Sequence, residues 1–299
     1  MGSLRGLKLV GLTLSVVFLF SYSRAAEISC QNFYQDLARS SVHGPALTVS
    51  IFIGNLDNPN SVENSDYSAG FAKWLRERMT SSCSAEPSEA TGFCDFVEES
   101  MATDVFFKLE KKNPWHLPVI VKLRRVEDYR AEASAESPEM SWLKGLQEAI
   151  TFDSATFVVS HSRGGIGPDP YPTPNPLAWL KRRYIDDYFS YVKKGLLASE
   201  KPNLLVLNLC NSDGHYRERV NEVAELMHDK SHKPIFLTAR DKDYELQFLE
   251  IMELTARLVG GLAAGSCPEK IRQEYEGFSP LTQQKQRDHY LWFPTEFWQ

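Results

Sequence analysis

Short apolar runs alternate with amphipathic stretches along most of the chain, and this alternation predicts its secondary structure. Runs of four to eight apolar and β-branched residues predict strands, whereas apolar residues spaced three or four apart predict helices. The predicted strands are 46–53, 104–109, 117–123, 155–159, 204–209 and 234–237. The predicted helices are 67–79, 140–150, 183–197, 217–227 and 244–262. The segments 104–109 and 117–123 could form either a hairpin or two separate strands.

This order of elements predicts an α/β fold. Parallel neighbouring strands need crossover connections, which are usually helices, and right-handed crossovers cover both faces of the sheet. We therefore expect a three-layer sandwich, with a mainly parallel sheet and helices on both faces. A single α/β domain is predicted over 27–267, followed by a C-terminal tail over 268–299. The tail ends in the aromatic segment 290–298 and is expected to pack on the domain, because it would promote aggregation if exposed.

The N-terminus has the pattern of a secretory signal peptide. Arg5 and Lys8 precede an apolar run over 9–22, and the small residues that a signal peptidase requires follow it. A spanning helix needs about 20 apolar residues, so this run favours a cleaved signal over a membrane anchor. We predict a signal peptide over 1–26 and a protein that is secreted or lies in the lumen of the secretory pathway.

Composition and charge narrow the possible functions. The chain is 42% hydrophobic and 24% charged, which is typical of a globular protein. Without residues 1–26, the chain has 30 Lys and Arg residues and 39 Asp and Glu residues, which gives a net charge of −9. Such a surface repels phosphate backbones and anionic lipids. We therefore expect neither a nucleic-acid partner nor a membrane partner after the signal is removed.

The chain has five cysteines, and an oxidising compartment favours their pairing. Cys83 and Cys94 flank a polar stretch and are expected to close a surface loop. Cys30 and Cys267 lie near opposite ends of the domain and could tie those ends together. Cys210 directly follows the apolar run 203–209, which predicts the carboxyl end of a buried strand. It could be either a buried structural thiol or a reactive one.

Polar segments follow three of the predicted strands, namely 160–165, 210–215 and 238–241. Ligands of open parallel sheets bind at the carboxyl ends of the strands, so these segments predict a site. One hypothesis places a nucleophile elbow at 160–164, with Ser162 as the nucleophile of a serine esterase of the α/β-hydrolase type. Asp241 and His289 follow in the order of that family. An elbow requires a helix immediately afterwards, and five prolines over 168–176 cannot continue one.

A second hypothesis pairs His161 with Cys210. A strand that ends in His161, a crossover, and a second buried strand that ends in Cys210 together resemble the caspase-like cysteine peptidases, which include legumain, the caspases and the CHAT-domain proteins. The resemblance covers about residues 45–262 and implies that Cys210 is the nucleophile and His161 protonates the leaving amine. Backbone amides near Ser162 and Cys210 would then stabilise the oxyanion. This sequence has Ser162 where the family has glycine.

Metal and nucleotide motifs are absent from the sequence, which contains no H-E-x-x-H, G-x-x-x-x-G-K or G-x-G-x-x-G string. We therefore expect no cofactor and no metal. The favoured function is a secreted cysteine hydrolase that cleaves peptide bonds in a peptide or protein substrate. The alternatives are a non-catalytic secreted α/β binding or effector protein and a serine esterase using Ser162. The reactivity of Cys210 separates these alternatives, because catalysis requires a free thiol with a low pKa.

Overall fold

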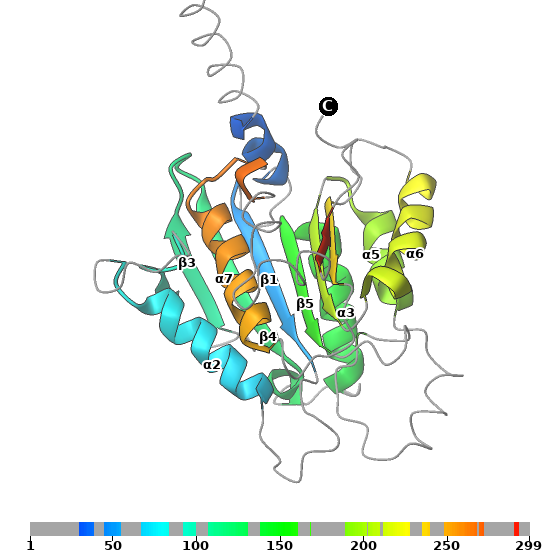
Figure 1. The fold of residues 1–299 in the computed structure, drawn as a ribbon, viewed down its shortest axis with the longest axis horizontal. Helices are drawn as coiled ribbons and strands as arrows, with labels where there is room; N and C mark the ends of the chain where they lie inside the picture. Colours follow the sequence, from blue (N-terminus) through cyan, green and yellow to red (C-terminus); the bar gives the residue numbers. More distant parts are fainter. Residues whose placement is uncertain are drawn as a thin grey trace, which may run out of the picture.

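A computed structural model describes the parts of the chain that form the domain core (Figure 1). The described residues are 30–38, 45–54, 67–83, 92–99, 107–130, 138–160, 168, 189–201, 203–209, 212–227, 235–239, 248–267, 269–271 and 290–292. Within them, no helix is long and apolar enough to cross a membrane.

The described strands form one mixed sheet. They are β1 (Leu47–Ile53), β2 (Val97–Glu99), β3 (Phe107–Lys112), β4 (Pro118–Arg125), β5 (Ala155–Ser160), β6 (Leu204–Leu209), β7 (Ile235–Ala239) and β8 (Tyr290–Trp292). Their order in the sheet is β2-β3-β4-β1-β5-β6-β7-β8. The five strands from β4 to β7 in this order are parallel, whereas β2, β3 and β8 pair with their neighbours in antiparallel fashion. The predicted strands 104–109 and 117–123 correspond to β3 and β4, which pair in antiparallel fashion and form a hairpin.

The described residues include five helices of ten to sixteen residues, a shorter helix over 30–38 and the 3-10 helix η1 (Val126–Arg130). The five longer helices are α2 (Tyr67–Thr80), α3 (Pro138–Phe152), α5 (Phe189–Ala198), α6 (Ser212–Leu226) and α7 (Phe248–Ala263). The predicted start of the fourth helix at Arg217 is wrong, because α6 begins at Ser212. The residues 183–188 and 244–247, predicted as helical, lie outside the described residues.

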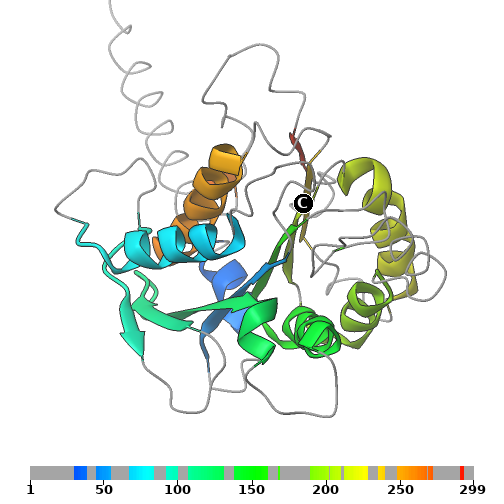
Figure 2. The ribbon, with the colours of Figure 1, turned by 90° about the horizontal axis from the view of Figure 1, so that it is seen from below.

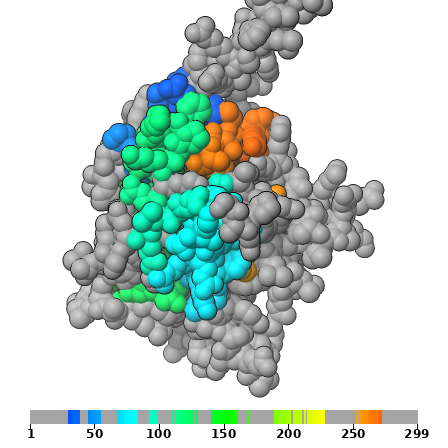
Figure 3. Space-filling model, turned by 90° about the vertical axis from the view of Figure 1, so that its left-hand side faces the viewer, coloured from blue at the N-terminus to red at the C-terminus, as the bar shows by residue number. Residues whose placement is uncertain are grey.

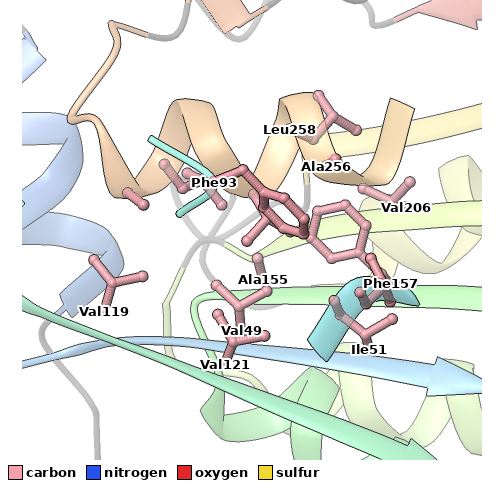
Figure 4. Packing of buried hydrophobic residues seen from close by; sticks show 14 of the residues in the cluster. Val49, Ile51, Phe93, Val119, Val121, Ala155, Phe157, Val206, Ala256 and Leu258 are labelled. Atoms are coloured by element: carbon pink, nitrogen blue, oxygen red, sulfur yellow. The ribbon is translucent and has the colours of Figure 1, made fainter. Parts of the chain in front are cut away.

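The two faces of the sheet have separate cores, because alternate residues of each strand point to opposite faces. Figure 2 shows helices on both sides of the sheet. On one face, Val49, Ile51 and Phe157 pack with α2, α7 and the helix over 30–38 (Figure 4). On the other face, Phe52 and Val158 pack with α3, α5 and α6. The protein is therefore a three-layer α/β sandwich with helices on both faces, as the sequence predicted. Figure 3 views the side on which α2 (cyan) and the end of α7 (orange) lie.

The structure contains the disulfides Cys30–Cys267 and Cys83–Cys94, which confirms both pairings expected from the sequence. Cys30 and Cys267 are bonded across 237 residues of sequence, which ties the helix over 30–38 to the end of α7. The Tyr34 hydroxyl donates a hydrogen bond at 2.7 Å to the Ser266 carbonyl beside this bond. Cys83 and Cys94 are bonded across 11 residues and close the connection between α2 and β2.

The C-terminal tail contains β8, the last described segment of the chain. Tyr290 pairs with Ala239 and Trp292 with Leu237, so β8 runs antiparallel to β7. Residues 290–292 of the tail are thereby part of the sheet. The rest of the tail beyond 271 lies outside the described residues.

Candidate functional site

The carboxyl edge of the parallel strands is where a ligand site would lie in this topology. β1 and β5 end side by side, with Ile53 paired to Val159, and the Gly54 amide donates a hydrogen bond at 2.9 Å to the Val159 carbonyl. β5 and β6 also end together, because Ser160 pairs with Leu209. Neighbouring strands lie about 4.8 Å apart, so the chain leaves β5 and β6 at adjacent points of this edge.

The predicted site residues follow these strand ends in sequence but lie outside the described residues. His161 and Ser162 come directly after the last residue of β5, and Cys210 comes directly after the last residue of β6. Asp241 and His289, the possible partners of Ser162, also lie outside. The structure therefore brings together Ser160 and Leu209, the residues that precede His161 and Cys210 in the sequence. The catalytic assignment of His161 and Cys210 stays a prediction.

The start of α6 is the feature of this edge that sequence reasoning missed. α6 begins at Ser212, only three residues after β6 ends at Leu209. The Ser212 side chain is buried, and its hydroxyl donates a hydrogen bond at 2.7 Å to the Leu207 carbonyl of β6. This bond holds the first residue of the helix against the strand. A serine three residues beyond an apolar run was the available signal, since serine is favoured at helix N-termini.

Aromatic packing fixes the beginning of α6 against α5. The rings of Phe189 and Tyr216 are stacked, with 5.7 Å between their centroids, and both side chains are buried. The Arg219 guanidinium lies 4.1 Å from the centroid of the Phe189 ring, within the range of a cation–π interaction. The first turns of both helices therefore pack together beside the carboxyl edge. The N-terminus of α6 carries a partial positive charge, which stabilises an anion nearby.

A buried polar cluster lies at the amino end of the strands, away from the predicted site. The Asp153 carboxylate accepts a hydrogen bond at 2.6 Å from the Ser50 hydroxyl and lies 3.7 Å from the Lys122 ammonium. The Asn203 side-chain amide donates a hydrogen bond at 2.7 Å to the Asp153 carbonyl. Periodicity could not identify this cluster, because its members come from four segments that only the folded chain brings together.

Lys201 belongs to the same region and is almost fully buried, with 2% of its surface exposed. Its ammonium donates a hydrogen bond at 3.2 Å to the Leu37 carbonyl, which also accepts one at 2.7 Å from the Ser154 hydroxyl. Burial lowers the pKa of Lys201 from 10.5 to about 8, while the charge of Asp153 acts in the opposite direction. These bonds attach the helix over 30–38 to the sheet, so the cluster has a structural role.

One group of possible metal ligands occurs within the described part of the chain, namely Cys83, Cys94 and Asp95. The two sulfurs form a disulfide and so are not thiolates, the form in which cysteine binds metal. The Asp95 carboxylate instead accepts a hydrogen bond at 3.1 Å from the Cys83 amide. These three residues therefore stabilise the loop between α2 and β2.

Comparisons with known proteins add no relative. No protein family, curated protein or solved structure matches this chain.

Proposed function

We propose that this protein is a cysteine hydrolase of the secretory pathway that cleaves peptide bonds through Cys210 and His161. The observation that carries the proposal is the pairing of Ser160 with Leu209 at the ends of β5 and β6. Each of the two proposed catalytic residues directly follows, in sequence, the last residue of one of these strands. A nucleophile and its acid–base partner must lie within hydrogen-bond reach, and two adjacent strand ends favour that arrangement.

The early start of α6 supports Cys210 as the nucleophile. Cys210 stands two residues before the first residue of α6, so the positive end of the helix dipole is nearby in sequence. A helix N-terminus and a neighbouring imidazolium both lower the pKa of a cysteine thiol and favour the thiolate. The thiolate is the form that attacks a carbonyl carbon.

The disulfide pairing supports the same assignment. Four of the five cysteines form the two disulfides, and Cys210 belongs to neither. In an oxidising compartment an odd cysteine is a free thiol or pairs with another chain. A free thiol at the carboxyl edge is what the proposed reaction requires.

The proposed reaction has two steps, formation of a thioester with Cys210 and hydrolysis of that thioester. The Cys210 thiolate attacks the peptide carbonyl carbon, and the oxyanion that forms is stabilised by backbone amides near Ser162 and Cys210. When the C–N bond breaks, the His161 imidazolium gives its proton to the leaving amine. Water then attacks the thioester and His161 takes its proton, which releases the carboxylic acid and restores the thiolate.

Thiol labelling tests the proposal directly. The folded, unreduced protein is treated briefly with iodoacetamide across a pH series and mapped by mass spectrometry, and the series is repeated on His161→Ala. We expect Cys210 alone to react, with a midpoint well below the ordinary thiol pKa of about 8.5 and slower labelling at low pH in the variant. A Cys210 that is paired, or that does not react in the folded protein, would overturn the proposal in favour of a non-catalytic binding protein.

Turnover separates the two nucleophile hypotheses. Wild type, Cys210→Ala and Ser162→Ala are incubated with a diverse peptide library and with a simple ester substrate, and products are identified by mass spectrometry. We expect peptide cleavage that Cys210→Ala abolishes and that Ser162→Ala retains in part. Ester cleavage abolished only by Ser162→Ala would instead support the serine esterase.

Entry into the secretory pathway is the second part of the proposal. The two disulfides are compatible with an oxidising compartment, and the sequence pattern over 1–26 supplies the route. We expect the full chain, expressed in cells that secrete proteins, to appear in the medium with Glu27 as its first residue. A protein that keeps residues 1–26 and stays in the cytosol would contradict this part without affecting the chemistry.

A further inference from the structure

The Cys83–Cys94 disulfide lies beside a carboxylate, and these groups together have the composition of a metal site. The two sulfurs and a carboxylate oxygen of Asp95 all lie within 4.8 Å of one another. Ligand atoms around a tetrahedral zinc ion lie about 3.3–3.8 Å apart, so small movements would bring all three onto one ion. We propose that Cys83, Cys94 and Asp95 bind one Zn²⁺ ion when the disulfide is reduced.

Two backbone hydrogen bonds hold the ends of this loop together independently of the disulfide. The Asp95 amide donates one at 2.8 Å to the Ser81 carbonyl, and the Phe96 amide donates one at 2.9 Å to the Met79 carbonyl. Both bonds join the end of α2 to the residues that directly follow Cys94. The two cysteines are therefore expected to stay close to each other after their bond is broken.

Packing on α7 holds the second half of the site from another side. Phe93, which directly precedes Cys94, is fully buried in the core. Gly92 has a φ of +90°, and a Cβ at this position would lie 2.5 Å from the Gly260 carbonyl oxygen of α7. The segment 92–94 is thus held against this helix by contacts of its own.

Asp95 has a conformation that keeps its carboxylate beside the sulfurs. Its φ of 59° lies in the left-handed region, which few residues other than glycine adopt. The Cys83 amide donates a hydrogen bond at 3.1 Å to one of the carboxylate oxygens. The oxygen ligand is therefore oriented before any metal binds. Asp95 is also exposed, so water can reach the ion and supply a fourth ligand.

The donor atoms select zinc among the common divalent ions. Two thiolates and one carboxylate match the sulfur and oxygen ligands that zinc accepts, whereas Mg²⁺ and Ca²⁺ take oxygen ligands. Three negative charges around one divalent ion also attract it strongly. Three protein ligands and one water complete the four positions that zinc prefers.

Zinc binding at this site is linked to the redox state of the surroundings, because cysteine binds metal as the thiolate. A dithiol reductant breaks the S–S bond by thiol–disulfide exchange, gives two electrons and two protons to the sulfurs, and itself becomes a disulfide. Zn²⁺ then displaces both protons into solution. Without such a dithiol the pair stays a disulfide and the ion does not bind.

Zinc titration of the reduced protein tests the proposal. The full chain carries Cys210→Ser, which removes the nucleophile of the proposed hydrolase and makes the result independent of that function. Bound zinc is measured by competition with a coloured chelator, with and without a phosphine reductant. We expect one Zn²⁺ per reduced chain and none in the oxidised chain. A reduced chain that binds no zinc, or that loses its native circular dichroism, would overturn the proposal.

Single substitutions in the same background assign the ligands. Cys83→Ser should abolish zinc binding although it leaves Cys30 and Cys267 in place. Asp95→Asn should weaken binding about tenfold, because the ion loses one of its charged ligands. Asp36→Asn, at a partly exposed aspartate outside the cluster, is the matched control and should bind as tightly as the parent. Zinc binding that survives Cys83→Ser, or that is equal in the two aspartate variants, would refute this ligand set.

Two further measurements do not depend on the chelator. Cd²⁺ bound by thiolates absorbs in the ultraviolet through sulfur-to-metal charge transfer, and this band should appear in the reduced parent and be absent from Cys83→Ser. Zinc at about 100 times its Kd should raise the Tm of the reduced protein by about 5 °C and leave the oxidised protein unchanged. A Tm that zinc does not raise in the reduced protein would contradict a site built by the fold.

Discussion

Replacing Lys201 with methionine is expected to stabilise the protein at neutral pH. Lys201 is 2% exposed, and burial lowers its pKa from 10.5 to about 8. The shift of about 2.5 units means that burying the charged form costs about 3 kcal/mol at pH 7. Methionine fills a similar volume without a charge. It forfeits the hydrogen bond to the Leu37 carbonyl, worth about 1 kcal/mol, and that carbonyl keeps its bond from Ser154.

The net gain in the free energy of unfolding is therefore about 2 kcal/mol at pH 7 for Lys201→Met. The gain must fall as pH rises, because the unfolded chain binds more protons than the folded one between pH 8 and 10.5. The wild type gains stability across that interval, and the variant does not. At pH 10 the difference should be close to zero.

Urea unfolding of both proteins at pH 7, 8, 9 and 10 measures this difference. The quantity compared is the difference between the two proteins at each pH, because effects common to both proteins cancel in it. Lys193→Met, at an exposed lysine of α5, is the control for the same substitution outside the core. A constant difference for Lys201→Met across the series would refute the reasoning, as would a variant less stable than wild type at pH 7.

Two further predictions concern packing and cross-links. Gly195→Ala should lower the free energy of unfolding by about 1–3 kcal/mol in urea unfolding, because the added Cβ would lie 2.8 Å from atoms of α3; an unchanged midpoint would contradict the close contact. The Cys30–Cys267 bond closes 237 residues and the Cys83–Cys94 bond only 11, so serine pairs should cost about 5 and about 3 kcal/mol, respectively. Equal losses of Tm in calorimetry would contradict the chain-entropy argument.

Much of the local structure was predictable because it depends on residues close in sequence. β1 is a run of mostly apolar and β-branched residues, and Trp142 and Leu146 recur at helical spacing in α3, so the local sequence identified both elements. The alternation of strands with helices then predicted the parallel sheet and its two helical layers.

The ends of elements were predicted less well. The start of α6 was missed because Gly214 and the polar residues around it do not continue the apolar period. At the start of this helix, the Ser212 hydroxyl donates a hydrogen bond to the Leu207 carbonyl of β6, which is a contact between separate elements.

The candidate site also has parts that the local sequence predicts and parts that only the tertiary structure decides. The sequence alone determined that His161 and Cys210 follow buried strands, since each stands at the end of an apolar run, and it also indicated both disulfide pairings. Only the tertiary structure decided that β5 and β6 are neighbours in register, so that Ser160 meets Leu209. The tertiary structure also decided that Lys201 and Asp153 share one buried region. Strand pairing and polar clusters join residues far apart along the chain, and no local period encodes such contacts.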